Sequence, residues 1–313
     1  MDNHPTLRES FSELQEWYQK DVHIPLTKLK ENKGKIKKDG DLYYPEKIDE
    51  RDIRHYYRSV SLRSNDGKSL FNQYHELVTR THKWRVPYFL SKDHYLYTWV
   101  DLQPDGAVKS IYSGENKDPQ TMLEEDYETI KKRFVEFQIL LNCSKKFGLG
   151  IDTKIKNIDS ELKFNTEHIV PQSWFRGKEP MKGDLHHLFV CQPECNTARS
   201  NFPYFDFSFY EPESPQERIQ NRCGVATNGG FEPENGKGTV ARAMLYFLLR
   251  YPHTIRKSFL KQINLSLLIS WHEQFPVSIY EKHRNRAIYR IQGNRNPFID
   301  HPELAAKLVF PMK

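Results

Sequence analysis

Three polar motifs near the middle of the sequence contain side chains of the types that bind metal ions, accept protons and hold anions. The first motif places a carboxylate beside an imidazole, Glu167 and His168, inside the otherwise apolar stretch FNTEHIVPQSWF. The second, GDLHHLF, contains His186, and the third, PECNTARSN, contains Asn196 and Arg199. Because the motifs follow one another closely, one small unit of structure can bring these five side chains together.

These residue types fit metal-assisted hydrolysis of a phosphodiester. Mg²⁺ prefers oxygen ligands and keeps several of its waters, so one carboxylate and one amide carbonyl from the protein are sufficient. Glu167 and Asn196 are the predicted ligands, and Mn²⁺ is expected to substitute for Mg²⁺. A neutral imidazole is suited to removing a proton from water near neutral pH, which makes His168 the predicted general base. The planar guanidinium of Arg199 is suited to holding the phosphate.

The adjacency of Glu167 and His168 has a geometric explanation. Neighbouring side chains on a regular strand point to opposite faces. A metal ion and an attacking water also lie on opposite sides of a phosphorus atom, so two directions are needed from neighbouring residues. This arrangement requires the strand to end or bend near the pair, and Pro171 is consistent with such a bend.

Two short strands and one helix are expected to position these residues. The stretches EHIVP and GDLHHLF resemble short strands with polar insertions, and Pro193 suits the first turn of a helix. Asn196 and Arg199 are three residues apart and therefore share one face of that helix. Turn residues separate residues 95–102 from 107–112, which predicts a hairpin. Apolar residues at helical spacing predict helices over residues 70–78, 118–141, 240–251, 265–271 and 280–291.

In these motifs, in the order NTEHIVP, DLHHL and NTARSN, the sequence resembles the bacterial endonuclease I family, a branch of the ββα-metal (His-Me finger) nucleases. The likeness continues through KGTVARAMLYFLLRY and RNRAIYRIQGNRNPFIDHPE, and it covers roughly residue 49 to the C-terminus. The resemblance implies the same metal ligands and general base, with Arg199 near the phosphate and His186 supporting the site. Arg176 or Lys178 would take the place of a phosphate-holding arginine that relatives carry in the loop after Ser173.

The resemblance also implies a fold and an activity. The expected fold is α+β, with a ββα-metal core embedded in a larger, mainly helical domain (residues 42–313) that follows an N-terminal arm (residues 1–41). The expected activity is Mg²⁺-dependent endonucleolytic hydrolysis of DNA, and also of RNA, with little sequence preference and 5′-phosphate products. The alternative is a non-catalytic or target-directed nucleic-acid-binding protein on the same scaffold. The lysine-rich run KLKENKGKIKKDG in the arm is either a solvated linker or a phosphate-binding segment.

Composition and charge limit the partners and the compartment. The sequence has 47 Lys and Arg against 41 Asp and Glu, and a net charge of +6 indicates a polyanionic partner only weakly. No apolar run approaches the length of a membrane span, so DNA or RNA is the expected partner and a membrane is not. The N-terminus shows no secretory leader. We therefore expect a cytoplasmic location, or export if a leader was removed or a non-classical route is used. An active nuclease in the cytoplasm would require an inhibitor or regulatory protein.

The cysteines and two arginines each allow more than one interpretation. Four cysteines are too few for a disulfide scaffold in a chain of 313 residues. They form a structural Zn²⁺ site, pair in disulfides or stay as buried free thiols. Arg242 is either an exposed charge or a buried, paired cation, and Arg295 either belongs to a structural turn or contacts substrate. The cysteines are Cys143, Cys191, Cys195 and Cys223.

Overall fold

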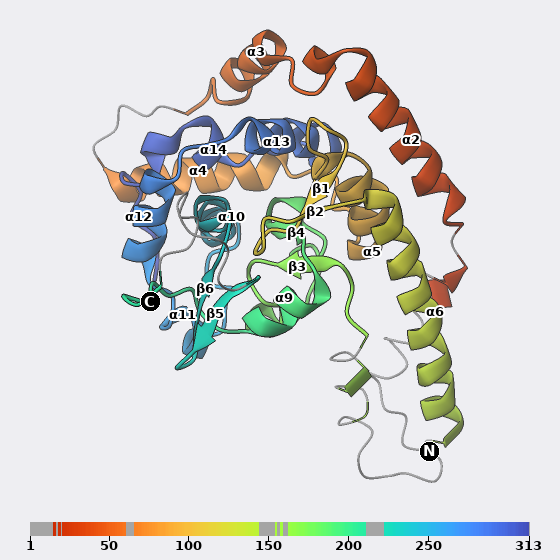
Figure 1. The fold of residues 1–313 in the computed structure, drawn as a ribbon. Coiled ribbons are helices and arrows are strands. Elements are labelled where there is room, and N and C mark those ends of the chain that lie inside the picture. The colour runs from red at the N-terminus through yellow and green to blue at the C-terminus, as the bar shows by residue number, and fades with distance from the viewer. Residues whose placement is uncertain are drawn as a thin grey trace.

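The computed structural model combines helices with small antiparallel sheets (Figure 1). It describes residues 15–16, 18–19, 21–60, 66–143, 154, 157–158, 162–210 and 222–312. In this part of the chain each of the three sheets has two strands, β1–β2, β3–β4 and β5–β6. The predicted α+β class is therefore confirmed. None of the described helices is long and apolar enough to cross a membrane.

The N-terminal half consists mainly of helices, and two of its predicted elements are confirmed. Helices occur over residues 70–78 and 118–141 as expected, and Asp118 accepts a hydrogen bond from the backbone N–H of Thr121 at the start of the second. The elements are α2 (His23–Lys38), η1 (Gly40–Leu42), α3 (Glu46–Tyr56), α4 (Gly67–Thr81), α5 (Tyr88–Leu90), η2 (Ser91–Val100), β1 (Val108–Lys109), β2 (Asn116–Lys117) and α6 (Pro119–Cys143).

The C-terminal half contains the central motifs and the remaining predicted helices, all three of which are confirmed. Its strands and the elements around them are β3 (Thr166–His168), α8 (Gln172–Phe175), η3 (Leu185–His187), β4 (Leu188–Val190), α9 (Pro193–Arg199), β5 (Gly224–Thr227) and β6 (Gly230–Pro233). The helices that follow are α10 (Lys237–Arg250), α11 (Lys257–Leu260), α12 (Leu265–Gln274), α13 (Ile279–Gln292), α14 (Pro297–Asp300) and η4 (Pro302–Leu304).

The β3–β4 pair is buried on both faces because it lies between two hydrophobic cores. Successive side chains on a strand point to opposite faces. Phe189 accordingly packs into the core around α10, whereas Leu188 and Val190 pack into the core around η2. A polar side chain on these strands is therefore held in apolar surroundings, where it stays ordered only if it has a partner.

The predicted strand over residues 95–102 is wrong, because residues 91–100 form the π-helix η2. The aromatic and β-branched composition favoured a strand. In the structure Leu96, Tyr97 and Val100 are all buried, which an alternating half-exposed strand would not achieve. Packing against α2, α6 and α13 provides enough apolar surface to bury these residues on several sides of a helix.

The lysine-rich run lies on α2, which packs along η2 rather than forming a solvated linker. Leu29 and Ile36 are buried in the core around η2, and the Asn32 side chain donates to the Thr98 carbonyl at 2.9 Å. Figure 1 shows α2 along one edge of the molecule. The division between an arm and a catalytic domain at residue 41 stays a prediction.

Candidate active site

The strand pair β3–β4 and helix α9 bring four of the five predicted site residues together. Glu167 lies opposite Phe189, and His168 opposite Leu188, in the antiparallel register. Helix α9 lies against β3 (Figure 1), where the Asn196 amide donates to the Thr166 carbonyl at 2.9 Å. The Arg199 guanidinium donates to the carbonyl of Ile169, just beyond β3, at 2.8 Å. Backbone acceptors of β3 and its extension thus hold the helix in place.

Glu167 is a buried carboxylate held by two side chains at one oxygen. The Tyr112 hydroxyl donates to Oε1 at 2.8 Å, and Nε of Arg199 lies 3.3 Å from the same oxygen. Tyr204 in turn contacts the Tyr112 hydroxyl at 2.9 Å. Burial raises the pKa of Glu167 to about 7, although Arg199 and Tyr112 oppose this shift. The carboxylate therefore lacks enough positive charge nearby to stabilise its ionised form fully.

His168 has a fixed orientation and a defined proton-accepting nitrogen. Its Nε2 lies 2.9 Å from the Lys182 carbonyl oxygen, and because that oxygen can only accept, Nε2 carries the proton. Nδ1 is then the basic nitrogen, and it accepts from the Gln172 amide at 3.3 Å. Burial, followed by the neighbouring His187, lowers the pKa of His168 well below its ordinary value. The imidazole is thus neutral at neutral pH and able to accept a proton.

The strand predicted for the motif GDLHHLF begins only at Leu188, as β4. His186 and His187 lie before it in the short 3₁₀ helix η3. The Asp184 side chain accepts from the His186 backbone N–H at 3.0 Å and so begins this turn. The His186 ring packs on Tyr246 with centroids 4.3 Å apart, whereas the His187 ring lies 5.5 Å from that of His168. His187, and not His186, is therefore the histidine in contact with the predicted base.

Arg199 is fully buried, and all of its nitrogens face the protein. Besides Ile169, it donates to the Ser200 carbonyl at 3.2 Å, and its guanidinium lies over the rings of Trp174 and Tyr204. Nε has no hydrogen-bond partner among the described residues, because its 3.3 Å contact with Glu167 is an ion pair without hydrogen-bond geometry. This placement supports Glu167. A role for Arg199 in binding phosphate stays a prediction.

The donor set fits a hard cation that keeps most of its waters. Asn196 uses its amide nitrogen to bind β3, which leaves its carbonyl oxygen as an available ligand. Glu167 supplies the carboxylate, and its raised pKa shows that a positive charge would stabilise it there. Among the described residues there is no group of three or more His, Cys, Asp or Glu side chains of the kind that encloses zinc.

The predicted zinc site is wrong, because Cys195 and Cys223 form a disulfide. Cys191 is a buried free thiol, and the side chain of Cys143 lies outside the described part of the chain. The disulfide joins α9 to β5 and so restrains the helix that carries Asn196. It does not support the cytoplasmic location expected from the sequence, since disulfides are rare in cytosolic proteins.

Arg242 and Arg295 belong to the scaffold. Arg242 is buried and pairs with Glu281 through two hydrogen bonds of 2.6 and 2.9 Å. Arg295 is fully buried and pairs with Asp49 and Asp300. This burial and pairing support the structural-turn interpretation of Arg295.

Sequence inspection missed the residues that hold Glu167 and His168. Tyr112 and Gln172 contact these two residues through side chains, and Lys182 contributes only its backbone carbonyl. Tyrosine and glutamine are common surface and core residues, and a backbone contact has no sequence signal. Nothing in the one-dimensional pattern distinguished them.

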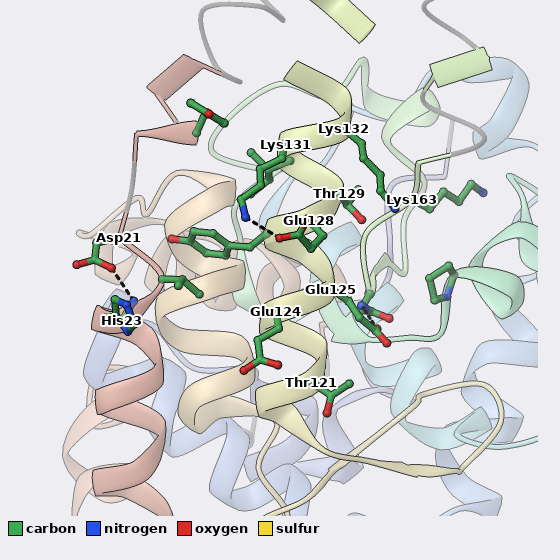
Figure 2. A pocket seen from close by; sticks show the side chains of 16 residues that line it. Asp21, His23, Thr121, Glu124, Glu125, Glu128, Thr129, Lys131, Lys132 and Lys163 are labelled. Carbon is green, nitrogen blue, oxygen red and sulfur yellow. Dashed lines mark hydrogen bonds and ion pairs between the residues drawn. The ribbon is translucent and has the colours of Figure 1, made fainter. Parts of the chain in front are cut away.

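A cavity of about 990 Å³ lies along α6 and the start of α2, separate from the candidate site. Figure 2 shows acidic and basic side chains around it, with Glu128 and Lys131 paired at 2.6 Å. Asn165 and Pro193 reach its edge next to β3 and α9, but neither the predicted metal ligands nor His168 line it. Its charged lining consists of Asp21, His23, Glu124, Glu125, Glu128, Lys131, Lys132 and Lys163.

The proteins that this chain resembles are nucleases. The model of the family described as Endonuclease I matches residues 72–303, so the chain belongs to the endonuclease I family. The resemblance seen in the central motifs is thereby confirmed.

Relatives from three bacteria show the extent of the similarity. An extracellular ribonuclease of Bacillus amyloliquefaciens is 33% identical over 171 residues, covering 50% of this chain and 57% of the relative. An extracellular ribonuclease of Bacillus subtilis (strain 168) is 30% identical over 161 residues, 46% of this chain and 54% of the relative. An extracellular deoxyribonuclease of Aeromonas hydrophila is 30% identical over 155 residues, covering 43% and 64% respectively. The chain thus spans little more than half the length of the two ribonucleases.

Proposed function

We propose that the protein is a divalent-metal-dependent endonuclease whose ββα-metal core consists of β3, β4 and α9. The observation that carries this proposal is the contact between α9 and β3, which places Asn196 beside a strand ending in Glu167 and His168. Membership of the endonuclease I family supports it.

In the proposed mechanism each residue has one role. Glu167 and Asn196 would hold Mg²⁺, which neutralises charge on the phosphate and on the leaving oxygen. Nδ1 of His168 accepts a proton from the attacking water, while the Lys182 carbonyl keeps the ring in the required orientation. The water oxygen bonds to phosphorus, the 3′ oxygen leaves, and the product carries a 5′-phosphate. Arg199 keeps Glu167 in place from the protein side.

The substrate and the compartment follow from the relatives and from the disulfide. Relatives named as ribonucleases and as deoxyribonucleases support action on both RNA and DNA. Little base preference is expected, because the chemistry acts on the backbone that all sequences share. We place the protein in an oxidising compartment outside the cytoplasm, since Cys195 and Cys223 form a disulfide and relatives are named as extracellular or periplasmic. An inhibitor is then needed only for protein that has not yet left the cytoplasm.

Replacing the base tests the mechanism. His168→Ala should lower the rate of plasmid nicking in Mg²⁺ about 10²- to 10⁴-fold, because general-base catalysis contributes on that order. Affinity for DNA measured in EDTA should be unchanged. The matched control is His55→Ala, which removes an exposed histidine on α3. Cleavage by the His168 variant at the wild-type rate would show that another group is the base.

The same assay separates the nuclease from the alternative of a non-catalytic binding protein on this scaffold. The wild-type chain should nick plasmid in Mg²⁺ and stop when EDTA is added. Binding without nicking, at any concentration of Mg²⁺ or Mn²⁺, would favour the binding protein.

A further inference from the structure

An exposed tryptophan lies between two exposed cations at residues 83–85. The side chain of Trp84 is 69% exposed, whereas Trp174 and Trp271 are buried. Lys83 and Arg85 on either side of Trp84 are also exposed. An exposed aromatic ring offers a flat face on which a planar group of a ligand can stack.

The backbone under Trp84 is anchored. The N–H groups of Lys83 and Trp84 both donate to the carbonyl of Gln292, at 3.1 and 3.2 Å, where α13 ends. Lys83 also donates to the Thr81 carbonyl at 2.8 Å. The indole is therefore presented on a backbone that loses little conformational entropy when a ligand binds, which favours recognition.

The segment that follows Trp84 leads to the candidate catalytic imidazole. Tyr88, four residues further along the chain, packs its ring 5.0 Å from that of His168. The Glu179 carboxylate accepts from the backbone N–H groups of Tyr88 and Gly183, both at 2.9 Å. It thereby ties the segment after Trp84 to the loop whose Lys182 carbonyl binds His168.

The surroundings of Trp84 carry positive charge. Lys83 and Arg85 are exposed, and among the described residues no ion pair joins either of them to an acidic side chain. Both oxygens of the nearby Glu179 carboxylate accept backbone hydrogen bonds. Exposed cations around an aromatic ring fit a polyanion whose bases are accessible.

We propose that Trp84, Lys83 and Arg85 form a binding surface for single-stranded nucleic acid, with the indole stacked on an unpaired base and the two cations on phosphates. Stacking requires the face of a base, and a duplex shows only base edges in its grooves. The surface therefore gives the nuclease proposed above a preference for single-stranded or locally unpaired substrate. Only this substrate preference rests on the proposed nuclease function, because binding at the surface is measured without cleavage.

Binding in EDTA tests the surface directly. The probes are a fluorescein-labelled single-stranded DNA of about 20 nucleotides, long enough to exceed a typical site size, and the same sequence as a duplex. Trp84→Ala should weaken single-strand binding about tenfold, because base stacking is worth that much or more by alanine substitution. Duplex binding should change less than about twofold. Trp84→Phe keeps a ring and should recover most of the affinity, while losing the quenching of tryptophan fluorescence that single-strand binding causes.

Phe209→Ala is the matched control, because Phe209 is 70% exposed and stacks on Phe207, outside the basic surface. It should bind both probes like the wild type, and circular dichroism should show that all variants are folded. Unchanged single-strand binding by Trp84→Ala, or equal losses on both probes, would overturn the proposal. A larger loss of single-strand binding in Phe209→Ala than in Trp84→Ala would also overturn the proposal. Wild-type cleavage in Mg²⁺ combined with any of these results would leave the nuclease proposal intact. Absence of cleavage with a selective Trp84 effect would overturn only the nuclease.

Discussion

The buried arginines of the C-terminal helical scaffold are paired with carboxylates more completely than the buried arginine of the β3–β4–α9 site. Arg242, Arg284 and Arg295 in the scaffold and Arg199 in the site are all at most 2% exposed. Each scaffold arginine pairs with carboxylates through direct hydrogen bonds. Arg199 instead contacts one oxygen of Glu167 at 3.3 Å, and its Nε has no hydrogen-bond partner among the described residues. The scaffold partners are Glu281, Asp101, Asp49 and Asp300.

This difference in pairing indicates which region of the protein can still bind a charged ligand. Burying an ion pair carries a desolvation penalty that only full hydrogen bonding offsets. The scaffold pairs make these hydrogen bonds and form a fixed frame, although burial also raises the pKa of Asp101 in that frame. In the site, Glu167 has a raised pKa and Nδ1 of His187 has no hydrogen-bond partner in the described residues. Incomplete pairing of this kind is expected where a cation and a phosphate are to bind.

Breaking a scaffold pair should give the largest change in stability. Arg295→Ala leaves the buried carboxylate of Asp300 without a cationic partner and that of Asp49 with only the more distant Arg286, and we expect the free energy of unfolding to fall by about 3–5 kcal/mol. Urea denaturation followed by circular dichroism measures this change. Specific activity per folded molecule, assayed at low urea, should stay within about twofold, because Arg295 does not contact the site.

The control is Arg290→Ala, which removes an arginine paired with Asp52 at 2.9 Å but 56% exposed in its side chain. Such exposed pairs contribute at most about 1 kcal/mol. Equal losses from both variants would mean that burial does not distinguish the scaffold pairs, and the comparison between regions would lose its basis.

The sequence predicted those parts of the fold and site whose information is local. Apolar residues at helical spacing located α10, α12 and α13, because one face of each helix packs into a core. The motif around Asn196 located α9, since Pro193 marks its first turn. Glu167, His168 and Asn196 lie together as expected, because the strand order places them on adjacent elements.

The remaining features depend on contacts between distant residues. Glu281 is 39 residues from Arg242, and Asp49 is 246 residues from Arg295, so sequence alone could not decide whether these arginines were paired. Four cysteines allow both a metal site and disulfides, and only the packing of α9 beside β5 decides between them. The π-helix η2 has the composition of a strand, which tertiary packing overrides.

Removing the disulfide should lower the free energy of unfolding by about 3.5 kcal/mol. The bond closes a loop with a sequence separation of 28, and a loop of this length restricts the unfolded chain by about that amount. Cys195→Ser/Cys223→Ser should therefore unfold at lower urea and need more Mg²⁺ for half-maximal nicking, because α9 carries Asn196. Dithiothreitol should reproduce both effects in the wild type and have no effect on the double variant. A wild type that is insensitive to reductant would show that the hydrogen bonds from α9 to the carbonyls of Thr166 and Ile169 hold the helix without the disulfide.

The smallest expected effect is on pH dependence, and it tests whether Glu167 lacks a full counter-charge. Its folded pKa of about 7 lies above the ordinary value of 4.5, so the folded state holds the proton more tightly than the unfolded state. Stability of the metal-free protein should therefore fall as pH rises from about 4.5 to 7, and this contribution is at most about 3 kcal/mol. Glu167→Gln cannot ionise and should lack it.

Urea titrations in EDTA at pH 5 and pH 8 measure this difference. The stability of Glu167→Gln relative to the wild type should be greater at pH 8 than at pH 5. Other titrating groups are common to both proteins and largely cancel in the comparison. Mg²⁺ at pH 8 should stabilise the wild type more than the variant, because a cation bound at the carboxylate provides the charge that Arg199 supplies only in part. Parallel stability curves for the two proteins would show that Arg199 and Tyr112 already compensate Glu167, and the site would then resemble the scaffold.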